Sequence, residues 1–414
     1  MTERRVVYVV RSFPRLSQTF ILNELLAIEA MGIDVHVVSM VHAREQLTHP
    51  RLALLRADVI YLDDLAALCL VHRARTHLAV AAGRPLRYLR AALRLARRPD
   101  AVAGYHGITR RQAFDHGVQL VGAVGLHRRS TVVRLHAHFA HDPTLVAQVA
   151  SAVSGVPFSF TGHARDLVQI SPKALAERVA DASAVLTICE TNAELLRAVS
   201  APVDRHKVHV VYNGIDTAAF TPRLPAATHV AGSVVSVGRF VDKKGFEVLL
   251  DALAAVVRSG TEVHLTIYGD GPLRPLLEAR IAALALADHV TLAGECTQDE
   301  LQQVLPSFAL FALTPYISDD GDRDGLPTVL VEAMSCGLPV VTTDVAGISD
   351  LVQHGVNGLL CPPRQVAPVA DALRALLADP SRCARLGAAA RQTVLDRFAQ
   401  SSTARRVADL LIGP

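Results

Sequence analysis

The stretch Val234-Val-Ser-Val-Gly-Arg-Phe-Val-Asp-Lys-Lys-Gly245 carries the pattern that decides the fold. Its β-branched run Val234–Val237 predicts a buried strand, and a glycine-bounded loop joins this strand to a helix predicted over Gly245–Arg258. The same alternation continues in the segments that follow, at 263–268, 273–284, 290–293, 310–313, 329–334 and 340–342. Continuous apolar strands that alternate with helices are typical of a parallel sheet covered on both faces.

The first half of the chain shows the same alternation. Short apolar runs predict strands at Val6–Val10, Val35–Ser39, Val59–Leu62, Val132–Leu135, Phe158–Thr161, Val185–Ile188 and Val208–Val211. Helices are predicted between them, at 19–31, 143–153 and 191–199. The pattern breaks at 221–232, a segment rich in Pro, Ala and Thr, and then restarts. Two domains of the same type are therefore the simplest interpretation.

We predict an α/β chain of two doubly wound, Rossmann-like domains that face each other across a cleft. The N-terminal domain is expected to span residues 1–221, a linker 222–232 and the C-terminal domain 233–390. The helical end of the chain, 391–414, is expected to pack back on the N-terminal domain. Ligands of doubly wound sheets bind outside the carboxyl ends of the strands, so we expect the site in the cleft.

Length and composition agree with this prediction. A chain of 414 residues fits two domains of about 200 residues each, and 50% hydrophobic with 20% charged residues is a globular composition. No run of apolar residues is long enough to span a bilayer, and the start MTERRVVYVV has no signal-peptide pattern, so we expect a cytoplasmic protein. The six cysteines are scattered, and neither they nor the 18 histidines show metal-ligand spacing. We therefore expect no disulfide framework and no metal site.

The charge is distributed unevenly. Of the 42 basic and 39 acidic residues, 25 and 17 lie in residues 1–205, which leaves 17 and 22 for the remainder. A basic half joined to an acidic half indicates two domains with different partners. Aromatic residues make up only 5% of the chain and no nucleic-acid module is visible, so an anionic membrane surface or a phosphorylated acceptor suits the basic half better.

The most informative local motif is Asp324-Gly-Leu-Pro-Thr-Val-Leu-Val-Glu332. Pro327 suits the first turn of a helix, and Gly325 lets the backbone approach a ligand closely. The free amides of a helix start bind anions such as a diphosphate. Asp324 and Glu332 can both point into the cleft and accept hydrogen bonds from sugar and ribose hydroxyls. The alternative is a capping aspartate followed by a solvated glutamate.

Two further loops follow predicted strands. In Gly238–Gly245, Arg239 can bind phosphate oxygens bidentately, and Lys244 adds a mobile positive charge. In Tyr268-Gly-Asp-Gly-Pro272, Gly269 belongs to a turn that allows close backbone approach. Taken singly, these are also the features of an ordinary charged surface loop and an ordinary turn.

Together these motifs resemble the donor domain of family 4 retaining glycosyltransferases, which have the GT-B fold. The order G-R-x4-K-G, Y-G-D-G-P and [D/E]-G-x-P-x4-E-A-M-x-x-G-x-P-V-V is the family's, and Asn213-Gly-Ile-Asp-x3-Phe220-x-Pro222 resembles its motif at the domain junction. The resemblance covers nearly the whole chain. It implies that the C-terminal domain binds a nucleotide sugar through the following residues: Arg239, Lys244, Gly269, Asp324, Gly325, Leu326, Pro327, Thr328 and Glu332.

The resemblance also assigns roles within this set. It implies that Arg239 and Lys244 bind the donor diphosphate and that Glu332 holds the ribose. Asp324 takes the first position of the family's E-x7-E, near the donor sugar. Because aspartate is shorter than glutamate by one methylene, Asp320 or Asp322 in the same acidic loop are alternative sugar contacts.

The loop after the first strand, Arg11–Phe20, resembles the S-F-P-x-L-S-[EQ]-T-F-[IV] motif of a subgroup linked to bacterial exopolysaccharide and colanic-acid-type assembly. Ser17 could cap a helix that begins at Gln18. The amides of that helix and the Thr19 hydroxyl could then approach the diphosphate from the other side of the cleft. The alternative is an N-cap that has no ligand.

Histidines cluster at the ends of two successive predicted strands, in His136-Ala-His138-Phe-Ala-His141 and Thr161-Gly-His163-Ala-Arg-Asp166. By resemblance, His138 matches the family's cleft histidine, which contacts donor sugar or acceptor, and His163 with Asp166 matches its T-x-H-x-x-D pattern. We therefore place His138, His163 and Asp166 on the acceptor side. His136 and His141 fit an acceptor-lining role and a structural role equally well.

A basic amphipathic helix is predicted over residues 84–98. Its arginines recur at spacings of three and four beside a leucine stripe: Arg84, Arg87, Arg90, Arg94, Arg97 and Arg98, with Leu86, Leu89 and Leu93. Such a helix can lie on an anionic membrane, with ~1 kcal/mol from each arginine near the lipid. The alternative is a solvated face that packs on the domain through its leucines.

The resulting hypothesis is a metal-independent hexosyltransferase that retains anomeric configuration. His138, Arg239, Lys244 and Asp324 are its expected catalytic residues. It would need no cofactor besides the nucleotide-sugar co-substrate, UDP- or GDP-linked, and no nucleic-acid partner. Its acceptor would be a saccharide, lipid-linked in surface polysaccharide synthesis. The alternatives are a transferase for a soluble secondary metabolite, a nucleotide-sugar epimerase and a scaffold with a decayed site.

Overall fold

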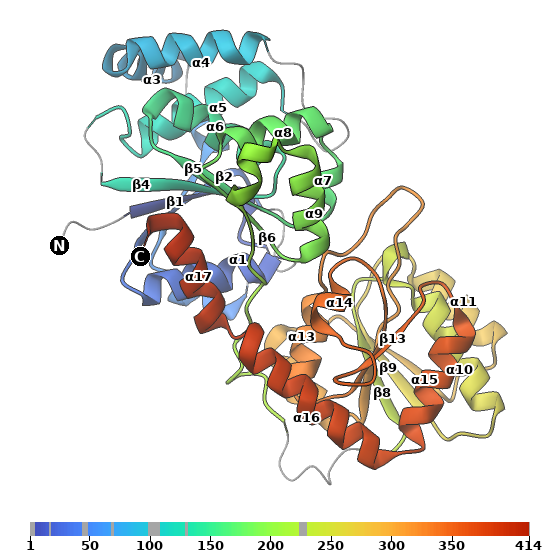
Figure 1. Ribbon diagram of the computed structural model, residues 1–414. Helices are drawn as coiled ribbons and strands as arrows, with labels where there is room; N and C mark the ends of the chain where they lie inside the picture. Colours follow the sequence, from blue (N-terminus) through green and yellow to red (C-terminus); the bar gives the residue numbers. More distant parts are fainter. Residues whose placement is uncertain are drawn as a thin grey trace. The chain divides into compact units, whose positions relative to one another are not determined.

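The computed structural model describes residues 5–15, 18–43, 49–67, 70–97, 108–128, 131–222 and 230–413. The chain divides into two compact units (Figure 1). The first consists of Met1–Gly214 with Ser401–Pro414, and the second of Ile215–Gln400.

The first unit contains a seven-stranded parallel sheet with the order β3-β2-β1-β4-β5-β6-β7. Its strands are β1 (Arg5–Phe13), β2 (Asp34–His42), β3 (Asp58–Tyr61), β4 (Val132–His138), β5 (Phe158–Gly162), β6 (Ala184–Thr187) and β7 (Val208–Val210). Strand β1 is paired with both β2 and β4, so the strand order reverses at β1. This point of reversal is where doubly wound sheets bind their ligands.

Helices cover both faces of this sheet. They are α1 (Thr19–Ala30), α2 (Leu62–Ala67), α3 (Leu70–Gly83), α4 (Pro85–Arg97), α5 (Arg110–Ala123), α6 (Asp142–Ser154), α7 (Arg165–Val168), α8 (Pro172–Asp181), α9 (Glu190–Val199) and α17 (Gln400–Ile412). Alternate residues of β1 enter separate cores, with Val7 and Val9 in one and Val6, Tyr8 and Val10 in the other. This alternation follows from the two-residue period of a strand.

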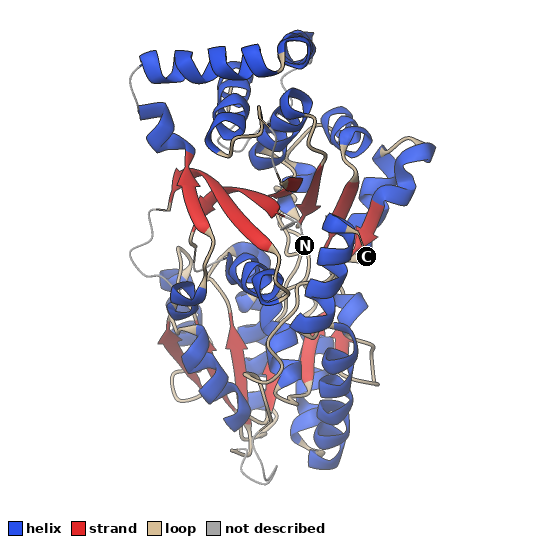
Figure 2. Cartoon of the chain, turned by 90° about the vertical axis from the view of Figure 1, so that its left-hand side faces the viewer, coloured by secondary structure: helices blue, strands red, loops and turns tan. Residues whose placement is uncertain are grey.

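The second unit contains a six-stranded parallel sheet with the order β10-β9-β8-β11-β12-β13 (Figure 2). Its strands are β8 (Ser233–Val237), β9 (His264–Tyr268), β10 (Val290–Gly294), β11 (Leu310–Ala312), β12 (Val340–Thr343) and β13 (Leu359–Cys361). Its helices are α10 (Phe246–Arg258), α11 (Arg274–Ala283), α12 (Gln298–Val304), α13 (Thr328–Ser335), α14 (Ile348–Leu351), α15 (Val366–Leu377) and α16 (Pro380–Arg397). The prediction of two doubly wound parallel-sheet domains is confirmed.

The boundary between the two units falls at a different residue of the chain from the one expected. The second unit begins at Ile215 instead of after residue 221, because Ile215 N donates to the Phe398 carbonyl over 3.0 Å. Arg391 of α16 donates to the carbonyls of Thr217, at 3.0 Å, and Phe220, at 2.6 Å, which ties this segment to the second unit. Of the expected linker 222–232, residues 223–229 lie outside the described residues.

The helical end of the chain is divided between the two units. Helix α16 belongs to the second unit, and the chain rejoins the first unit at Ser401, later than the expected residue 391. Helix α17 places Val407, Ala408 and Leu411 in the same core as Tyr8 of β1. The expectation that the C-terminal end packs on the N-terminal domain therefore holds for α17 and not for residues 391–400.

Candidate functional site

In the second unit, the loops after β8 and β9 are locked together through their backbones. A Cβ atom on Gly269 would lie 2.0 Å from the carbonyl oxygen of Gly238, and Gly269 has a φ of +144° that side chains rarely adopt. Gly238 N also donates to the Tyr268 carbonyl over 2.9 Å. Gly269, predicted as a donor-binding residue, is thus a glycine because it allows the two loops to touch.

The loop after β8 also contacts the end of β11. Gly245, which precedes α10, has a φ of +67°, and a Cβ there would lie 1.9 Å from the Thr314 carbonyl. Thr314 Oγ1 donates in return to the Gly245 carbonyl over 2.7 Å. These contacts fix Lys243 and Lys244, the residues just before Gly245, at the carboxyl ends of β8 and β11, where the strand order reverses.

Two lysines and two aspartates form an ionic cluster at this place. Lys244 Nζ lies 2.6 Å from Asp324 Oδ2, and Lys243 Nζ lies 3.3 Å from Asp324 Oδ1 and 3.1 Å from Asp322 Oδ1. Burial acts to raise the pKa of Asp324, but Lys244 and Lys243 outweigh it and lower that pKa. Asp324 is therefore an ionised carboxylate held by two ammonium groups.

The cluster brings together the predicted Lys244 and Asp324, and it includes Lys243, which the sequence analysis missed. The signal for Lys243 was its position beside Lys244 in the G-R-x4-K-G loop. Asp322, predicted as an alternative sugar contact, is paired with Lys243. Arg239 is exposed in the same loop.

Helix α13 begins at Thr328, and Pro327 is its N-cap, with φ −64° and ψ 119°. The expectation that Pro327 occupies the first turn is thus wrong by one residue, because its ψ is extended. The Gly325 carbonyl accepts from Gly347 N over 2.8 Å, which anchors the preceding loop. Leu326 is buried there, and Thr328 is half-buried. Pro327 makes no side-chain cap at the start of α13.

Glu332 lies in the second turn of α13 and is only 5% exposed. Its Oε1 accepts a hydrogen bond from Gln298 Nε2 over 3.1 Å. Burial raises the pKa of Glu332 to about 7, in spite of that hydrogen bond. The alternative of a solvated glutamate is therefore excluded, and so is a capping Asp324, since the N-cap is Pro327. Gln298, in a different segment, gave no signal in the sequence.

In the first unit, the predicted histidines meet at the ends of β4 and β5. His138 Nδ1 lies 3.0 Å from His163 Nε2, and the two rings stack with centroids 5.3 Å apart. Both residues are buried, and burial lowers the pKa of His163 well below its ordinary value. Phe139, which follows His138, has a φ of +75°. Such a conformation is rare for a bulky residue and is often found at functional sites.

Asp166 is present at this place but is occupied by backbone amides. Its carboxylate accepts from the N–H groups of Ala140 at 2.7 Å, Ala164 at 2.8 Å and His163 at 3.1 Å. Burial raises the pKa of Asp166 against the effect of these bonds. Asp166 thus joins the loops that carry His138 and His163.

His136 and His141 have partners within the fold. His136 Nδ1 lies 2.8 Å from Ser159 Oγ and its Nε2 3.0 Å from Thr161 Oγ1. His141 Nδ1 accepts from Asp142 N over 2.8 Å. Burial lowers the pKa of each to about 3, so both are neutral near pH 7. These contacts favour the structural interpretation of both residues.

Two residues of the Arg11–Phe20 loop were predicted to approach the donor. Ser17 lies outside the described residues. Helix α1 begins at Thr19, which is half-buried, and not at Gln18. Gln18 is the N-cap residue and makes no side-chain cap.

Helix α4 presents its leucines to solvent. Leu86, Leu89 and Leu93 are 67%, 56% and 46% exposed, so the alternative in which they pack on the domain is wrong. Arg94 Nη2 pairs with Asp181 Oδ1 at 2.5 Å, and Arg98 lies outside the described residues.

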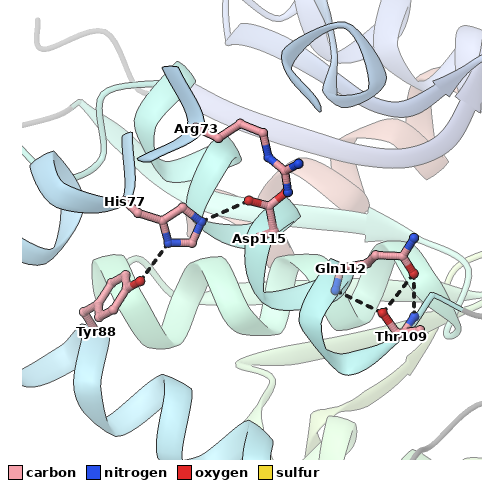
Figure 3. A network of polar contacts seen from close by, with 6 residues as sticks. All are labelled: Arg73, His77, Tyr88, Thr109, Gln112 and Asp115. Atoms are coloured by element: carbon pink, nitrogen blue, oxygen red, sulfur yellow. Dashed lines mark hydrogen bonds and ion pairs between the residues drawn. The ribbon is translucent and has the colours of Figure 1, made fainter. Parts of the chain in front are cut away.

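The opposite face of α4 is attached by a polar network (Figure 3). The Tyr88 hydroxyl lies 2.7 Å from His77 Nδ1 of α3, and His77 Nε2 lies 3.0 Å from Asp115 Oδ1 of α5. Arg73 Nη2 donates to Asp115 Oδ2 over 2.7 Å. Three helices are thereby connected, so the orientation of α4 with its leucines outward is determined by the fold. Among the described residues, no helix is long and apolar enough to cross a membrane.

Comparison with known proteins shows which class of protein this chain is similar to. Residues 231–393 match the family of glycosyl transferases group 1. The chain is 26% identical over 420 residues to the amylovoran biosynthesis glycosyltransferase AmsK of Erwinia amylovora, covering 98% of this chain and 99% of that protein. It is 27% identical over 421 residues to the putative colanic acid biosynthesis glycosyltransferase WcaL of Escherichia coli K12, with the same coverage.

The fold is shared with solved structures. Anabaena HepE in complex with UDP superposes with a TM-score of 0.69 at 18% identity, over 98% of both chains. The two parallel-sheet α/β units are those of the GT-B fold of glycosyltransferases.

Proposed function

We propose that this protein is a metal-independent retaining glycosyltransferase, which moves a sugar from a UDP- or GDP-sugar to a hydroxyl of a saccharide acceptor. The observation that carries the proposal is the cluster of Lys243, Lys244 and Asp324, next in the chain to the helix that holds the buried Glu332. The match of residues 231–393 to the group 1 family supports it. So do the relatives in amylovoran and colanic acid biosynthesis, which match over their full length.

In this proposal the donor is held by the second unit. Arg239, Lys243 and Lys244 bind the diphosphate, together with the amides at the start of α13. When the donor binds, the lysines leave Asp324 and contact the phosphates. Asp324 then accepts a hydrogen bond from a sugar hydroxyl. Glu332 accepts hydrogen bonds from the ribose hydroxyls. These bonds would replace the hydrogen bonds to water that a buried carboxylate cannot make.

Charge accounts for the chemical step. The positive side chains stabilise the negative charge that develops on the departing nucleoside diphosphate, so no metal ion is required for that purpose. The acceptor hydroxyl attacks the anomeric carbon from the face that the diphosphate leaves. A phosphate oxygen of the leaving group takes the hydroxyl proton, and the new glycosidic bond retains the donor's configuration.

The acceptor is assigned to the first unit. His138 and His163 supply directional hydrogen-bonding groups, which suit sugar hydroxyls. Thr19, and Ser17 outside the described residues, would complete the site at the start of α1. Asp166 acts on the acceptor through the backbone that it holds.

We propose that the acceptor is lipid-linked and that the protein works at the cytoplasmic face of a membrane. The exposed leucines of α4 beside Arg87, Arg90 and Arg97 suit an anionic interface. A soluble acceptor is the second candidate, favoured by 27% identity over 335 residues to the alpha-D-kanosaminyltransferase of Streptomyces kanamyceticus.

A transfer assay tests the proposal. Purified full-length protein is incubated in EDTA with UDP- or GDP-sugars, and with either a polyprenyl-diphosphate-linked saccharide in vesicles or an aminocyclitol. The proposal predicts α-linked product on the lipid-linked acceptor from one nucleotide class. Product on the aminocyclitol alone would select the second candidate, and a converted sugar with donor alone would indicate an epimerase. Absence of any reaction in EDTA that Mg²⁺ restores would contradict metal independence.

A further inference from the structure

A half-buried carboxylate, that of Glu24, lies next to His138, and no motif indicated it. Tyr8 of β1 donates its hydroxyl proton to Glu24 Oε1 of α1 over 2.9 Å. The same oxygen lies 3.4 Å from Nε2 of His138. The Tyr8 ring stacks on His138 with centroids 5.8 Å apart and planes 20° apart. Three elements, β1, α1 and β4, thus converge on the side of His138 that faces away from His163.

The charge of Glu24 determines what it can do there. Burial acts to raise the pKa of Glu24, but His138, His136 and the Tyr8 hydroxyl outweigh burial and lower it. Glu24 is therefore ionised near neutral pH, and an ionised carboxylate only accepts hydrogen bonds. The nitrogen of His138 that faces it must carry a proton, or a lone pair and a negative charge would oppose each other.

In its neutral form the imidazole of His138 has a single N–H, so a proton on Nε2 leaves a lone pair on Nδ1. Nε2 of His163 lies 3.0 Å from that Nδ1 and must then be the donor. The direction of the His138–His163 hydrogen bond follows from Glu24. It also leaves a lone pair on Nδ1 of His163, a buried atom with no hydrogen-bond partner among the described residues.

His136 completes the surroundings of His138. Atoms of Glu24, His136 and His138 lie within 4.8 Å of one another, a spacing that a metal ion could also use. However, both nitrogens of His136 already contact hydroxyls, those of Ser159 and Thr161. A metal ion bound to His136 would have to break one of these bonds, whereas control of the His138 proton leaves both intact.

We propose that Glu24, held by Tyr8, is a positioning residue that keeps the proton of His138 on Nε2 and so directs the His138–His163 pair. The consequence is an acceptor lone pair on Nδ1 of His163. This inference rests on the proposed function, in which these histidines serve the sugar acceptor. Glu24 itself acts through His138.

The test combines two substitutions of Glu24 with one of Tyr8, in the full chain. Glu24→Met keeps the length of the side chain and removes the acceptor atoms, Glu24→Gln keeps an acceptor and removes the charge, and Tyr8→Phe removes only the hydroxyl. Long-range ¹H–¹⁵N correlation spectra of ¹⁵N-histidine-labelled protein identify the protonated nitrogen of each ring, with His138→Gln and His163→Gln for assignment. Transfer kinetics and the Kd for the nucleoside diphosphate are measured in parallel.

The proposal predicts a Nε2–H form of His138 in the native protein and its loss in Glu24→Met. It predicts kcat/KM for the acceptor about 10- to 100-fold lower in Glu24→Met, by analogy with the loss of residues that orient metal-binding histidines. Glu24→Gln should lose less and Tyr8→Phe least, with the nucleotide Kd unchanged in all three. A His138 proton on Nδ1 in the native protein, or the same spectrum in Glu24→Met, would overturn the proposal.

Further outcomes separate this inference from the proposed function. If the native protein transfers no sugar while Glu24→Met still changes the His138 spectrum, the transferase proposal fails and the proton assignment stands. If the native protein transfers sugar and Glu24→Met is equally active, the positioning role is refuted. Stoichiometric zinc in the purified protein, lost in Glu24→Met, would replace it with a metal site.

Discussion

The two units carry different side chains at the reversal points of sheets that are wound in the same order. At the reversal point of the second sheet, lysines and carboxylates are paired at 2.6–3.3 Å, and the charges persist despite burial. At the reversal point of the first sheet, histidines are packed against one another, and burial keeps His136 and His163 neutral. Paired charge suits a diphosphate, and neutral directional groups suit sugar hydroxyls. Because both sheets are wound alike, the difference between the units lies in the loops at their strand ends.

The largest effect should come from removing charge in the second unit. Lys244→Ala is expected to lower kcat about 100- to 1,000-fold, the typical cost of one group that stabilises transition-state charge. Steady-state kinetics measure it, and Lys173→Ala, an exposed lysine on α8, is the matched control. If both variants keep native kcat, charge in the second unit does not drive the reaction.

Glu332 should make stability depend on pH. Its pKa is raised from 4.5 to about 7, so the native state binds the proton more tightly than the unfolded state does. The contribution of Glu332 to the free energy of unfolding should therefore be largest below pH 4.5. It should fall by up to about 3 kcal/mol as the pH rises to about 7.

The measurement for Glu332 is urea unfolding of the native chain and Glu332→Gln at pH 5 and pH 8 without nucleotide. The variant should lose most of this difference between the two pH values, because its amide does not titrate. If the free energy of unfolding had the same pH dependence in both proteins, Glu332 would already be ionised at pH 5. Glu332 and Asp324 would then not differ in their charge.

The substitution Asp324→Asn tests the ionic cluster of the second unit by removing a negative charge instead of a positive one. It removes the carboxylate that holds both lysines, so the affinity for UDP or GDP should rise about tenfold, or about 1.4 kcal/mol, as the lysines are freed for phosphate. Sugar transfer should fall, since the donor-sugar contact is lost. Calorimetric titration measures the affinity, with Asp371→Asn, an exposed acid of the same unit, as control. Weaker nucleotide binding would show that Asp324 organises the lysines instead of competing for them.

The smallest effect concerns the basic surface of the first unit. Arg90→Gln and Arg97→Gln should each weaken binding to phosphatidylglycerol vesicles by ~1 kcal/mol, about fivefold. Arg205→Gln, an exposed arginine outside α4, should leave vesicle binding unchanged. Co-sedimentation at low and high salt measures this effect. Equal losses in all three variants would indicate a general charge effect and not a contact made by α4.

The sequence predicted the regular parts of the molecule well. Runs such as Val6–Val10 are strands because β-branched residues pack on both faces of a covered sheet, and that signal is local. The lysines and carboxylates of the second unit lie in short motifs whose spacing can be read from the sequence. Their expected loops do meet at one sheet edge, because parallel strands all end there.

The remainder depends on contacts between distant segments. Glu24 lies far from His138 in the chain, and Gln298 lies in a different helix from Glu332. Asp166 matched a motif, yet its partners are backbone amides, which no side-chain pattern reveals. The domain boundary moved to Ile215 for the same reason, since its partner Phe398 lies at the other end of the unit.

Calorimetric titration of the full chain with UDP- and GDP-sugars in EDTA is the direct test of the proposal that the second unit binds a nucleotide sugar through its paired charges. We expect binding of one nucleotide class without metal, abolished in Lys243→Ala/Lys244→Ala and in Glu332→Ala, and unchanged in His138→Gln. Absence of binding by folded protein would contradict it, as would binding that the double lysine variant retains.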